Sequence, residues 1–146
     1  MNNKLTTVED CKIVSLPKIQ NTSGNITALE NKKSIPFDVN RVYYLYDVPS
    51  NEERGGHAHY ELEHYLVAGS GSFDIVLKDG NQSKIVNINR PDQALHIVPG
   101  IWRELQNFSG GSICLVLASL KFDENDYLRD FTQFLNWKIK NNESNS

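Results

Sequence analysis

Residues 72–89 read SFDIVLKDGNQSKIVNIN, and this stretch decides the class of fold. Two runs with alternating apolar residues, 72–78 and 83–89, are joined by a turn that contains Asp79-Gly80-Asn81. Alternation with a period of two is typical of half-buried strands, and Asp-Gly is a strong signal for a β-hairpin. The stretch therefore predicts two neighbouring antiparallel strands.

Further short strand-like runs lie on both sides of this hairpin. Turn residues separate them, and they cover the segments 40–47, 94–98, 101–107 and 112–120. Short strands at this spacing indicate an antiparallel sandwich or barrel. The period then changes, because the apolar residues near the C-terminus recur at steps of three and four. This predicts an amphipathic helix over 123–140, followed by a low-complexity, flexible tail at 141–146. We therefore expect an all-β jelly roll closed by one C-terminal α-helix.

The length and composition narrow the possible functions. A chain of 146 residues with 39% hydrophobic and 23% charged residues is typical of a single globular domain, here 1–146. A net charge of −3 argues against a basic face for nucleic acid. The longest apolar run, 113–118, is far shorter than the ~20 residues of a membrane span, and the polar N-terminus predicts no secretion signal. Cys11 and Cys114 lie outside any CxxC motif, so we expect free thiols in the cytoplasm.

The sequence RGGHAH at 54–59 carries the most chemical information. His57 and His59 are two residues apart, so on a strand both side chains point to the same face. The two glycines before them allow the backbone to turn tightly. If that face is the barrel interior, both imidazoles and the Arg54 guanidinium enter one cavity.

Three interpretations of the histidine pair compete. The side chains could lie on an outer surface of the barrel. They could bind a metal, since HxH followed by Glu63 resembles the first metal motif of the cupins, but Trp102 stands where those cupins carry a third histidine. The third interpretation is acid–base catalysis without a metal, in which one imidazole acts as base and the other as acid. Arg54 would then stabilise an oxyanion on a sugar ketone. We favour the third.

Several motifs together resemble one family of enzymes. They are RVYYLYD at 41–47, RGGHAH at 54–59, VLAS at 116–119 and FDENDYLRDF at 122–131. Over roughly residues 37–135 the chain is similar to the dTDP-4-keto-6-deoxyglucose 3,4-ketoisomerases of the cupin superfamily. The resemblance implies an antiparallel, cupin-type jelly roll. It also implies an isomerase that moves a keto group from C4 to C3 of a dTDP-linked deoxysugar, with no metal and no organic cofactor.

The resemblance also implies roles for individual residues. His57 and His59 are expected to be the acid–base pair, and Tyr44 is expected to reach the same pocket as a third catalytic residue. Arg54, Tyr46 and Trp102 are the expected substrate-binding residues, although Trp102 could instead fill the core. Members of the family form homodimers by exchanging N-terminal strands, which here predicts an exchanged strand within 1–16, at Leu5–Leu16. The expected pathway is the synthesis of dTDP-3-amino-3,6-dideoxyhexoses for bacterial surface glycans such as lipopolysaccharide.

Some positions depart from the family, and two other functions stay open. Gly56, Tyr60 and His64 differ from the usual residues and could alter the stereochemistry delivered at C4. The alternative enzyme is a dTDP-4-keto-sugar 3,5-epimerase, and the alternative binding protein is a non-catalytic nucleotide-sugar-binding cupin.

Alternation along the strands also assigns faces to residues outside the histidine motif. His96 should face away from Leu95 and Ile97, toward solvent. Tyr43 should face away from Tyr44, against an outer sheet or a dimer partner. Arg129 is expected to pair with acidic neighbours rather than to bind a diphosphate.

Overall fold

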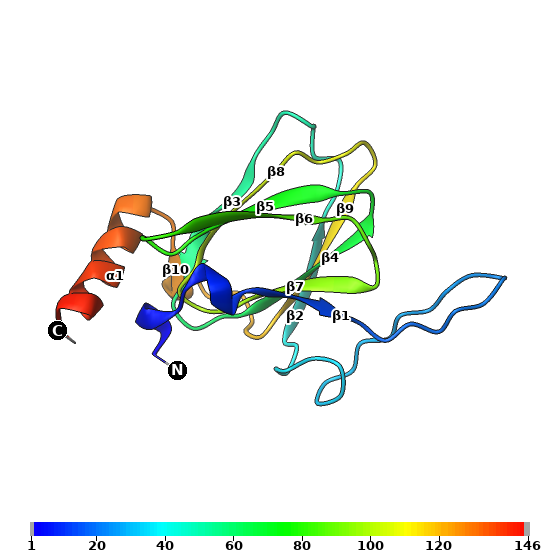
Figure 1. The fold of residues 1–146 in the computed structure, drawn as a ribbon, viewed down its shortest axis with the longest axis horizontal. Coiled ribbons are helices and arrows are strands. Elements are labelled where there is room, and N and C mark those ends of the chain that lie inside the picture. Colours follow the sequence, from blue (N-terminus) through cyan, green and yellow to red (C-terminus); the bar gives the residue numbers. More distant parts are fainter. Residues whose placement is uncertain (1, 145–146) are drawn as a thin grey trace.

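The computed structural model describes residues 2–144. Within this range the chain forms short strands, three 3₁₀ turns and one α-helix (Figure 1). The strands are β1 (Lys12–Ser15), β2 (Arg41–Leu45), β3 (Arg54–His59), β4 (His64–Ser70), β5 (Phe73–Lys78), β6 (Ser83–Ile88), β7 (Gln93–Ile97), β8 (Trp102–Gln106), β9 (Ile113–Ala118) and β10 (Tyr127–Leu128). The helical elements are η1 (Asn3–Leu5), η2 (Val8–Asp10), η3 (Glu124–Asp126) and α1 (Phe131–Ser144).

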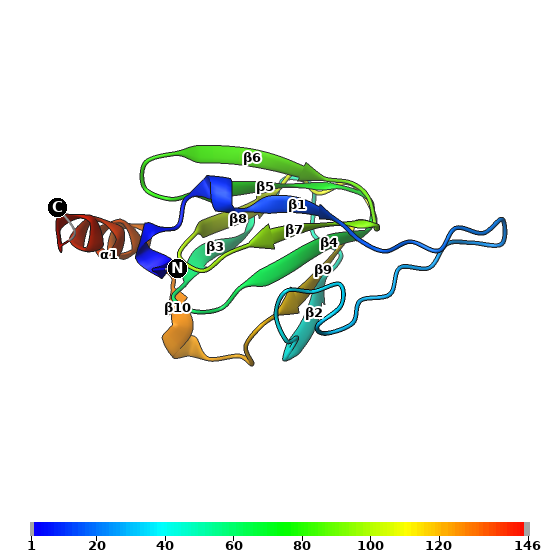
Figure 2. The same cartoon turned by 60° about the horizontal axis from the view of Figure 1, so that its bottom comes forward.

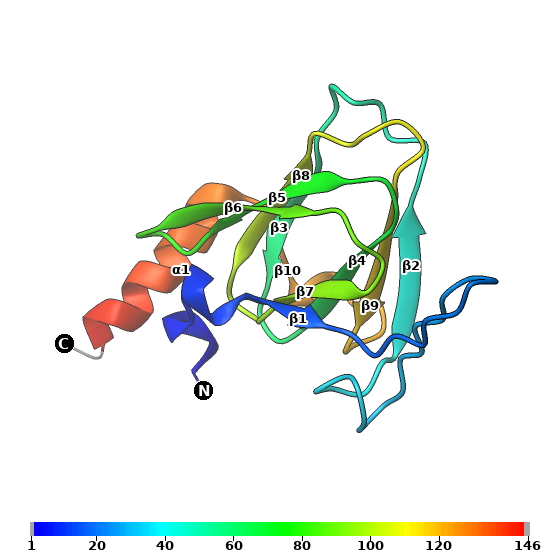
Figure 3. The ribbon, with the colours of Figure 1, turned by 45° about the vertical axis from the view of Figure 1, so that its right-hand side comes forward.

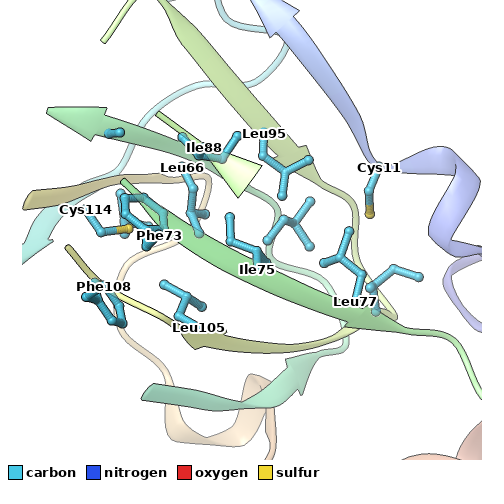
Figure 4. Packing of buried hydrophobic residues seen from close by; sticks show 14 of the residues in the cluster. Cys11, Leu66, Phe73, Ile75, Leu77, Ile88, Leu95, Leu105, Phe108 and Cys114 are labelled. Carbon is cyan, nitrogen blue, oxygen red and sulfur yellow. The ribbon is translucent and has the colours of Figure 1, made fainter. Parts of the chain in front are cut away.

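The strands form two five-stranded antiparallel sheets that face each other (Figures 2 and 3). One sheet has the order β1-β7-β4-β9-β2, and the other has the order β10-β3-β8-β5-β6. The core lies between them and includes Leu66, Phe73, Ile75 and Leu95 (Figure 4). This arrangement confirms the predicted all-β, cupin-type jelly roll.

The hairpin predicted from residues 72–89 is the β5–β6 pair. Its register runs from Phe73 opposite Ile88 to Lys78 opposite Ser83. The Asp79 carboxylate accepts hydrogen bonds from the backbone N–H groups of Asn81 and Gln82, and these bonds close the turn. The periodicity and the turn signal therefore predicted this part of the fold correctly.

The C-terminal segment differs from the predicted helix over 123–140. The α-helix begins at Phe131, while residues 124–126 form η3 and Tyr127–Leu128 pair with β3 as β10. The start at Phe131 follows from Asp130, whose side chain accepts from the Gln133 N–H at 2.9 Å and caps the helix. The helix extends to Ser144, so it includes part of the segment predicted as a tail, and residues 145–146 of that tail lie outside the described residues.

The N-terminal segment packs along one side of the body and then leaves it. β1 pairs with β7 of the same chain, with Lys12 opposite His96. The chain continues into a narrow arm that extends away from the body and is bridged between Ile19 and Ile26 (Figure 1). It then returns over the outer face of the first sheet, where Leu29, Phe37 and other apolar residues cover Tyr65 and Val67. Within residues 2–144, none of the helices combines the length and apolar character that crossing a membrane requires.

Candidate active site

The two histidines of the RGGHAH motif face the interior of the barrel from β3. Gly55 has a φ of +82°, and the pairing of β3 with β8 shifts between Arg54 and His57, so the strand carries a bulge just before the histidines. The ring centroids of His57 and His59 are 4.8 Å apart and the rings are perpendicular. His59 is completely buried. The prediction that both imidazoles share one interior face is confirmed.

Strand β4 of the facing sheet adds a third imidazole, and β8, the neighbour of β3 in its own sheet, adds a guanidinium. His64, on β4, lies 5.2 Å from His59 between ring centroids. Arg103, on β8, donates from Nη1 to His64 Nδ1 at 2.8 Å and from Nη2 to the carbonyl oxygen of Ile101 at 3.0 Å. Arg103 is only 2% exposed, and among the described side chains no carboxylate forms an ion pair with it. A buried cation without an anionic partner is unusual and indicates a site for developing negative charge.

His57, His64 and Arg103 line a cavity of about 120 Å³. Its polar lining comes from both sheets, and its remaining walls are apolar. The lining residues are Tyr43, Leu45, Arg54, Gly55, His57, His64, Leu66, Arg103, Leu105 and Val116. A mostly apolar pocket with a few convergent polar groups is typical of a small-molecule site.

Burial determines the protonation state of the imidazoles. Loss of solvent, together with the nearby Arg103 cation, lowers the pKa of His57 to about 2 and that of His59 to about 4. The same causes hold the pKa of His64 well below its usual value. All three rings are therefore neutral at pH 7, and each has one nitrogen able to accept a proton. In the described part of the chain, the Nε2 atoms of His57 and His59 are buried and have no hydrogen-bond partner.

The predicted place of Tyr44 in this pocket is wrong. The alternation along β2 turns Tyr43 and Leu45 into the cavity, so Tyr44 points outward and is 58% exposed. Tyr43 therefore does face away from Tyr44, but toward the interior rather than toward an outer sheet or a partner. Burial raises the pKa of Tyr43 to about 12, so its hydroxyl stays protonated.

The predicted substrate-binding residues lie in three different places. Arg54 lines the cavity and also a neighbouring outer groove, where Tyr46 lies beside Tyr44 and is 60% exposed. Trp102 is buried on the other face of its sheet against Phe131 and Phe134 of α1, with ring centroids 5.1 and 5.8 Å away. The prediction that Trp102 floors the sugar pocket is therefore wrong, and the core-filling alternative is confirmed. Alternation along β8 points Arg103 inward instead, although from the sequence the alternation showed only that one of these two neighbours would face the interior.

The remaining candidate residues take structural positions outside the cavity. His96 faces away from Leu95 and Ile97, as predicted, but not toward open solvent: its side chain is only 20% exposed and lies against Phe37 and Tyr65. Its Nε2 lies 2.8 Å from Glu63 Oε1. Arg129 pairs with Glu124 through two nitrogens, at 2.6 and 2.9 Å, as predicted. Among residues 2–144, no group of three or more His, Cys, Asp or Glu side chains is arranged to hold a metal ion.

The chain is similar to known proteins over most of its length. The family described as "FdtA: WxcM-like, C-terminal" matches residues 9–139. The TDP-4-oxo-6-deoxy-alpha-D-glucose-3,4-oxoisomerase of Aneurinibacillus thermoaerophilus is 38% identical over 131 residues, covering 90% of this chain and 94% of that protein. A 3,4-ketoisomerase from Helicobacter canadensis is 45% identical, with a TM-score of 0.87 and 89% and 98% of the two chains covered. A sugar 3,4-ketoisomerase from Thermoanaerobacterium thermosaccharolyticum, solved with TDP, is 37% identical, with a TM-score of 0.88 and 90% and 96% covered.

Proposed function

Because the chain belongs to the FdtA family (WxcM-like, C-terminal), we propose that it is an isomerase converting dTDP-4-keto-6-deoxy-D-glucose to a dTDP-3-keto-6-deoxyhexose. One observation carries the proposal. The Nε2 atoms of His57 and His59 are buried and unpartnered in the described structure, and the cavity that His57 lines also contains the Arg103 guanidinium. Two bases and one cation close to one another are the groups that an enolisation needs.

The reaction follows as acid–base chemistry at two neighbouring carbons. An imidazole removes the C3 proton, and the electron pair of that C–H bond moves into the C4 carbonyl to give an enediolate. The C3 hydroxyl then loses its proton and becomes the new ketone, while C4 receives one proton and the oxygen on C4 receives another to become a hydroxyl. No atom is gained or lost overall. Arg103 stabilises the enediolate oxygen, because it lies inside the cavity, whereas Arg54 lies at the cavity edge and is assigned to substrate binding.

This scheme assigns no metal and no organic cofactor. The position at which the resemblance to metal-binding cupins predicts a third histidine is occupied by Trp102. An indole is not a metal ligand, and here it packs against α1. The proton transfers described above require only groups that the chain supplies.

Turnover in deuterated water tests the proposed function. The protein is incubated with dTDP-4-keto-6-deoxyglucose, and the product is examined by NMR. A ketoisomerase gives a 3-keto product with deuterium at C4 and leaves C5 unlabelled. Exchange at C5 as well as at C3 would identify a 3,5-epimerase instead, and binding without any exchange would identify a non-catalytic nucleotide-sugar-binding protein.

The proposal extends to assembly, with a homodimer formed by exchange of N-terminal strands. In the described structure β1 is an edge strand paired with β7 of its own chain, and exchange would place it on β7 of the second copy without opening the middle of either sheet. The arm that follows β1 exposes Ile19 and Ile26, which are 64% and 60% accessible. Apolar side chains on an extended arm are suited to packing on a second copy of the chain.

We also assign the reaction to the cytoplasm and to the supply of 3-amino-3,6-dideoxyhexoses for surface glycans. Cys11 and Cys114 are buried free thiols, which suits a reducing compartment. A 3-keto sugar is the direct precursor for transamination at C3.

A further inference from the structure

A buried carboxylate contacts His59 from outside the catalytic motif. Asp126, in η3, is 7% exposed, and its Oδ2 lies 3.1 Å from His59 Nδ1. The same carboxylate accepts from the backbone N–H of Glu61 at 2.8 Å and from that of Leu62 at 3.1 Å. Two backbone donors therefore fix its position.

The charge of Asp126 determines which nitrogen of His59 carries the proton. Burial alone would raise the pKa of Asp126, but the hydrogen bonds from His59, Glu61 and Leu62 outweigh it and lower the pKa below its usual value. An ionised carboxylate can only accept hydrogen bonds, so His59 Nδ1 must donate. The neutral ring then keeps its lone pair on Nε2, the atom that has no partner among the described residues.

The charges of the other groups around His59 differ from that of Asp126. His57 on β3, His64 on β4, Tyr127 on β10 and the cations Arg103 and Arg129 all lie near the ring. Of these groups and Asp126, only Asp126 is an anion. It therefore offsets part of the cost of forming an imidazolium at His59, which the two arginines would otherwise oppose.

We propose that Asp126 is a positioning residue that holds His59 with its proton on Nδ1, so that Nε2 accepts a proton during turnover. This inference rests on the proposed ketoisomerase function. In the step concerned, a proton passes from the substrate to His59 Nε2, the ring becomes an imidazolium, and Asp126 stays ionised beside Nδ1. The proton leaves from Nε2 later in the same cycle.

The first test is the tautomer of the wild-type protein, read from long-range ¹H–¹⁵N correlations of the histidine rings. We expect His59 to be protonated at Nδ1 at pH 7. A ring protonated at Nε2 would overturn the proposal without any variant. This measurement does not depend on turnover, so it separates the proposal from the proposed function, which fails if the wild-type protein gives no 3-keto product.

The second test is the variant Asp126→Asn, with Asp123→Asn as its matched control. Asp123 caps the same turn through its own side chain but is exposed and does not touch a histidine. We expect Asp126→Asn to lower kcat by ~10²–10⁴-fold, to leave KM within about threefold, and to shift His59 toward the Nε2-protonated tautomer. Asp123→Asn should change none of these. An unchanged tautomer or kcat in Asp126→Asn, or equal losses in both variants, would overturn the proposal.

Discussion

Among single residues, Arg103 is a buried cation that also lies inside the candidate site. Taking a guanidinium out of water costs several kcal/mol unless anions or hydrogen bonds compensate it. Here the compensation comes from His64 Nδ1 and one backbone carbonyl, while the Nε atom has no partner in the described structure. Burial lowers the pKa of Arg103 to about 10, which still leaves the side chain charged at pH 7. The fold thus keeps a cation where the substrate would develop negative charge.

The histidine pair gives the most direct prediction at this scale. Replacing His57 or His59 by Asn removes a proton acceptor but keeps a polar side chain of similar size. We expect kcat to fall by ~10²–10⁴-fold in each variant, with an unchanged circular dichroism spectrum. His96→Asn is the control, because His96 lies on the outer face and should keep near-native activity. Near-native rates in both His57→Asn and His59→Asn would contradict the acid–base roles.

The variant Arg103→Met shows how the Arg103 charge affects the stability of the fold and, separately, the rate of the reaction. Methionine has a similar volume and needs no solvation, so the free energy of unfolding should stay within ~1 kcal/mol of wild type or rise. The loss of the cation should lower kcat by ~10²-fold or more. Urea unfolding and steady-state kinetics measure the two effects. Arg90→Met, at an exposed position, should change neither, and a stable, fully active Arg103→Met would refute the oxyanion role.

Alternation along strands explains both what the sequence predicted at the site and what it missed. The two-residue spacing of His57 and His59 was enough to predict that both side chains lie on the same face of a strand. Tyr43 and Tyr44, like Trp102 and Arg103, are neighbours of which only one can point inward, and the sequence does not say which. Asp126 escaped prediction for a different reason, since its partner His59 is distant in sequence and meets it only through the tertiary fold.

At the scale of elements, the N-terminal turn η1 and the loop before β8 touch closely at Gly100. This residue has a φ of +80°, and a Cβ there would collide with the carbonyl oxygen of Asn3 and lie 2.7 Å from Thr6 Oγ1. Gly111 has a similar φ of +70° but nothing within 4 Å of the Cβ position. Alanine at position 111 would therefore add only backbone strain, whereas alanine at position 100 would add backbone strain and a steric collision with Asn3.

We expect Gly111→Ala to cost ~1–2 kcal/mol, which is the penalty of the left-handed conformation alone. Gly100→Ala should cost a further ~1–3 kcal/mol, because η1 must move away from the loop. Chemical denaturation of the two variants gives the comparison. Equal losses of unfolding free energy in the two variants would mean that the collision with Asn3 adds no cost.

Helix α1 is attached to the N-terminal segment by a buried lysine. Lys138 is 3% exposed and donates from Nζ to the carbonyl oxygen of Thr6 at 2.7 Å. Burial lowers its pKa from 10.5 to about 8. Between about pH 8 and pH 10.5, the Lys138 amine is protonated in the unfolded chain but mostly neutral in the folded chain. The free energy of unfolding therefore rises with pH across this range.

The pH dependence provides the measurement. Between pH 7.5 and 10, the wild-type free energy of unfolding should rise relative to that of Lys138→Met, by ~1–3 kcal/mol. Lys78→Met is the matched control, since Lys78 lies near Phe131 of the same helix but is partly exposed. It should follow the wild-type curve. A Lys138→Met curve parallel to wild type would show that the buried amine does not titrate in this range.

The helical period predicted the existence of α1 but not its start. Tyr127 and Leu128 fit the apolar spacing of a helix, yet their backbone pairs with Ala58 and His59 of β3. The paired edge strand and the Asp130 cap outweigh the periodicity. The helix continues beyond Lys138 to Ser144, and the Lys138 side chain turns into the interface with the N-terminal segment.

At the scale of the whole molecule, the arm after β1 extends from the body and leaves apolar side chains exposed in a single copy. Under the proposed dimer, Ile19 and Ile26 pack on the second subunit. We expect the double variant Ile19→Lys/Ile26→Lys to shift the protein from dimer to monomer in sedimentation velocity. Ile85→Lys is the control, because Ile85 is equally exposed, at 63%, but lies on β6 away from the arm. A wild-type protein that sediments as a monomer would refute the dimer.

The contact between Thr6 and Lys138 joins positions 132 residues apart in the chain. During synthesis, the N-terminal turn therefore emerges from the ribosome long before its partner exists. Its contact with helix α1 cannot form until almost the whole chain has been translated. A nascent chain stalled before residue 138 should consequently expose η1 to proteases, whereas the released protein should resist cleavage there.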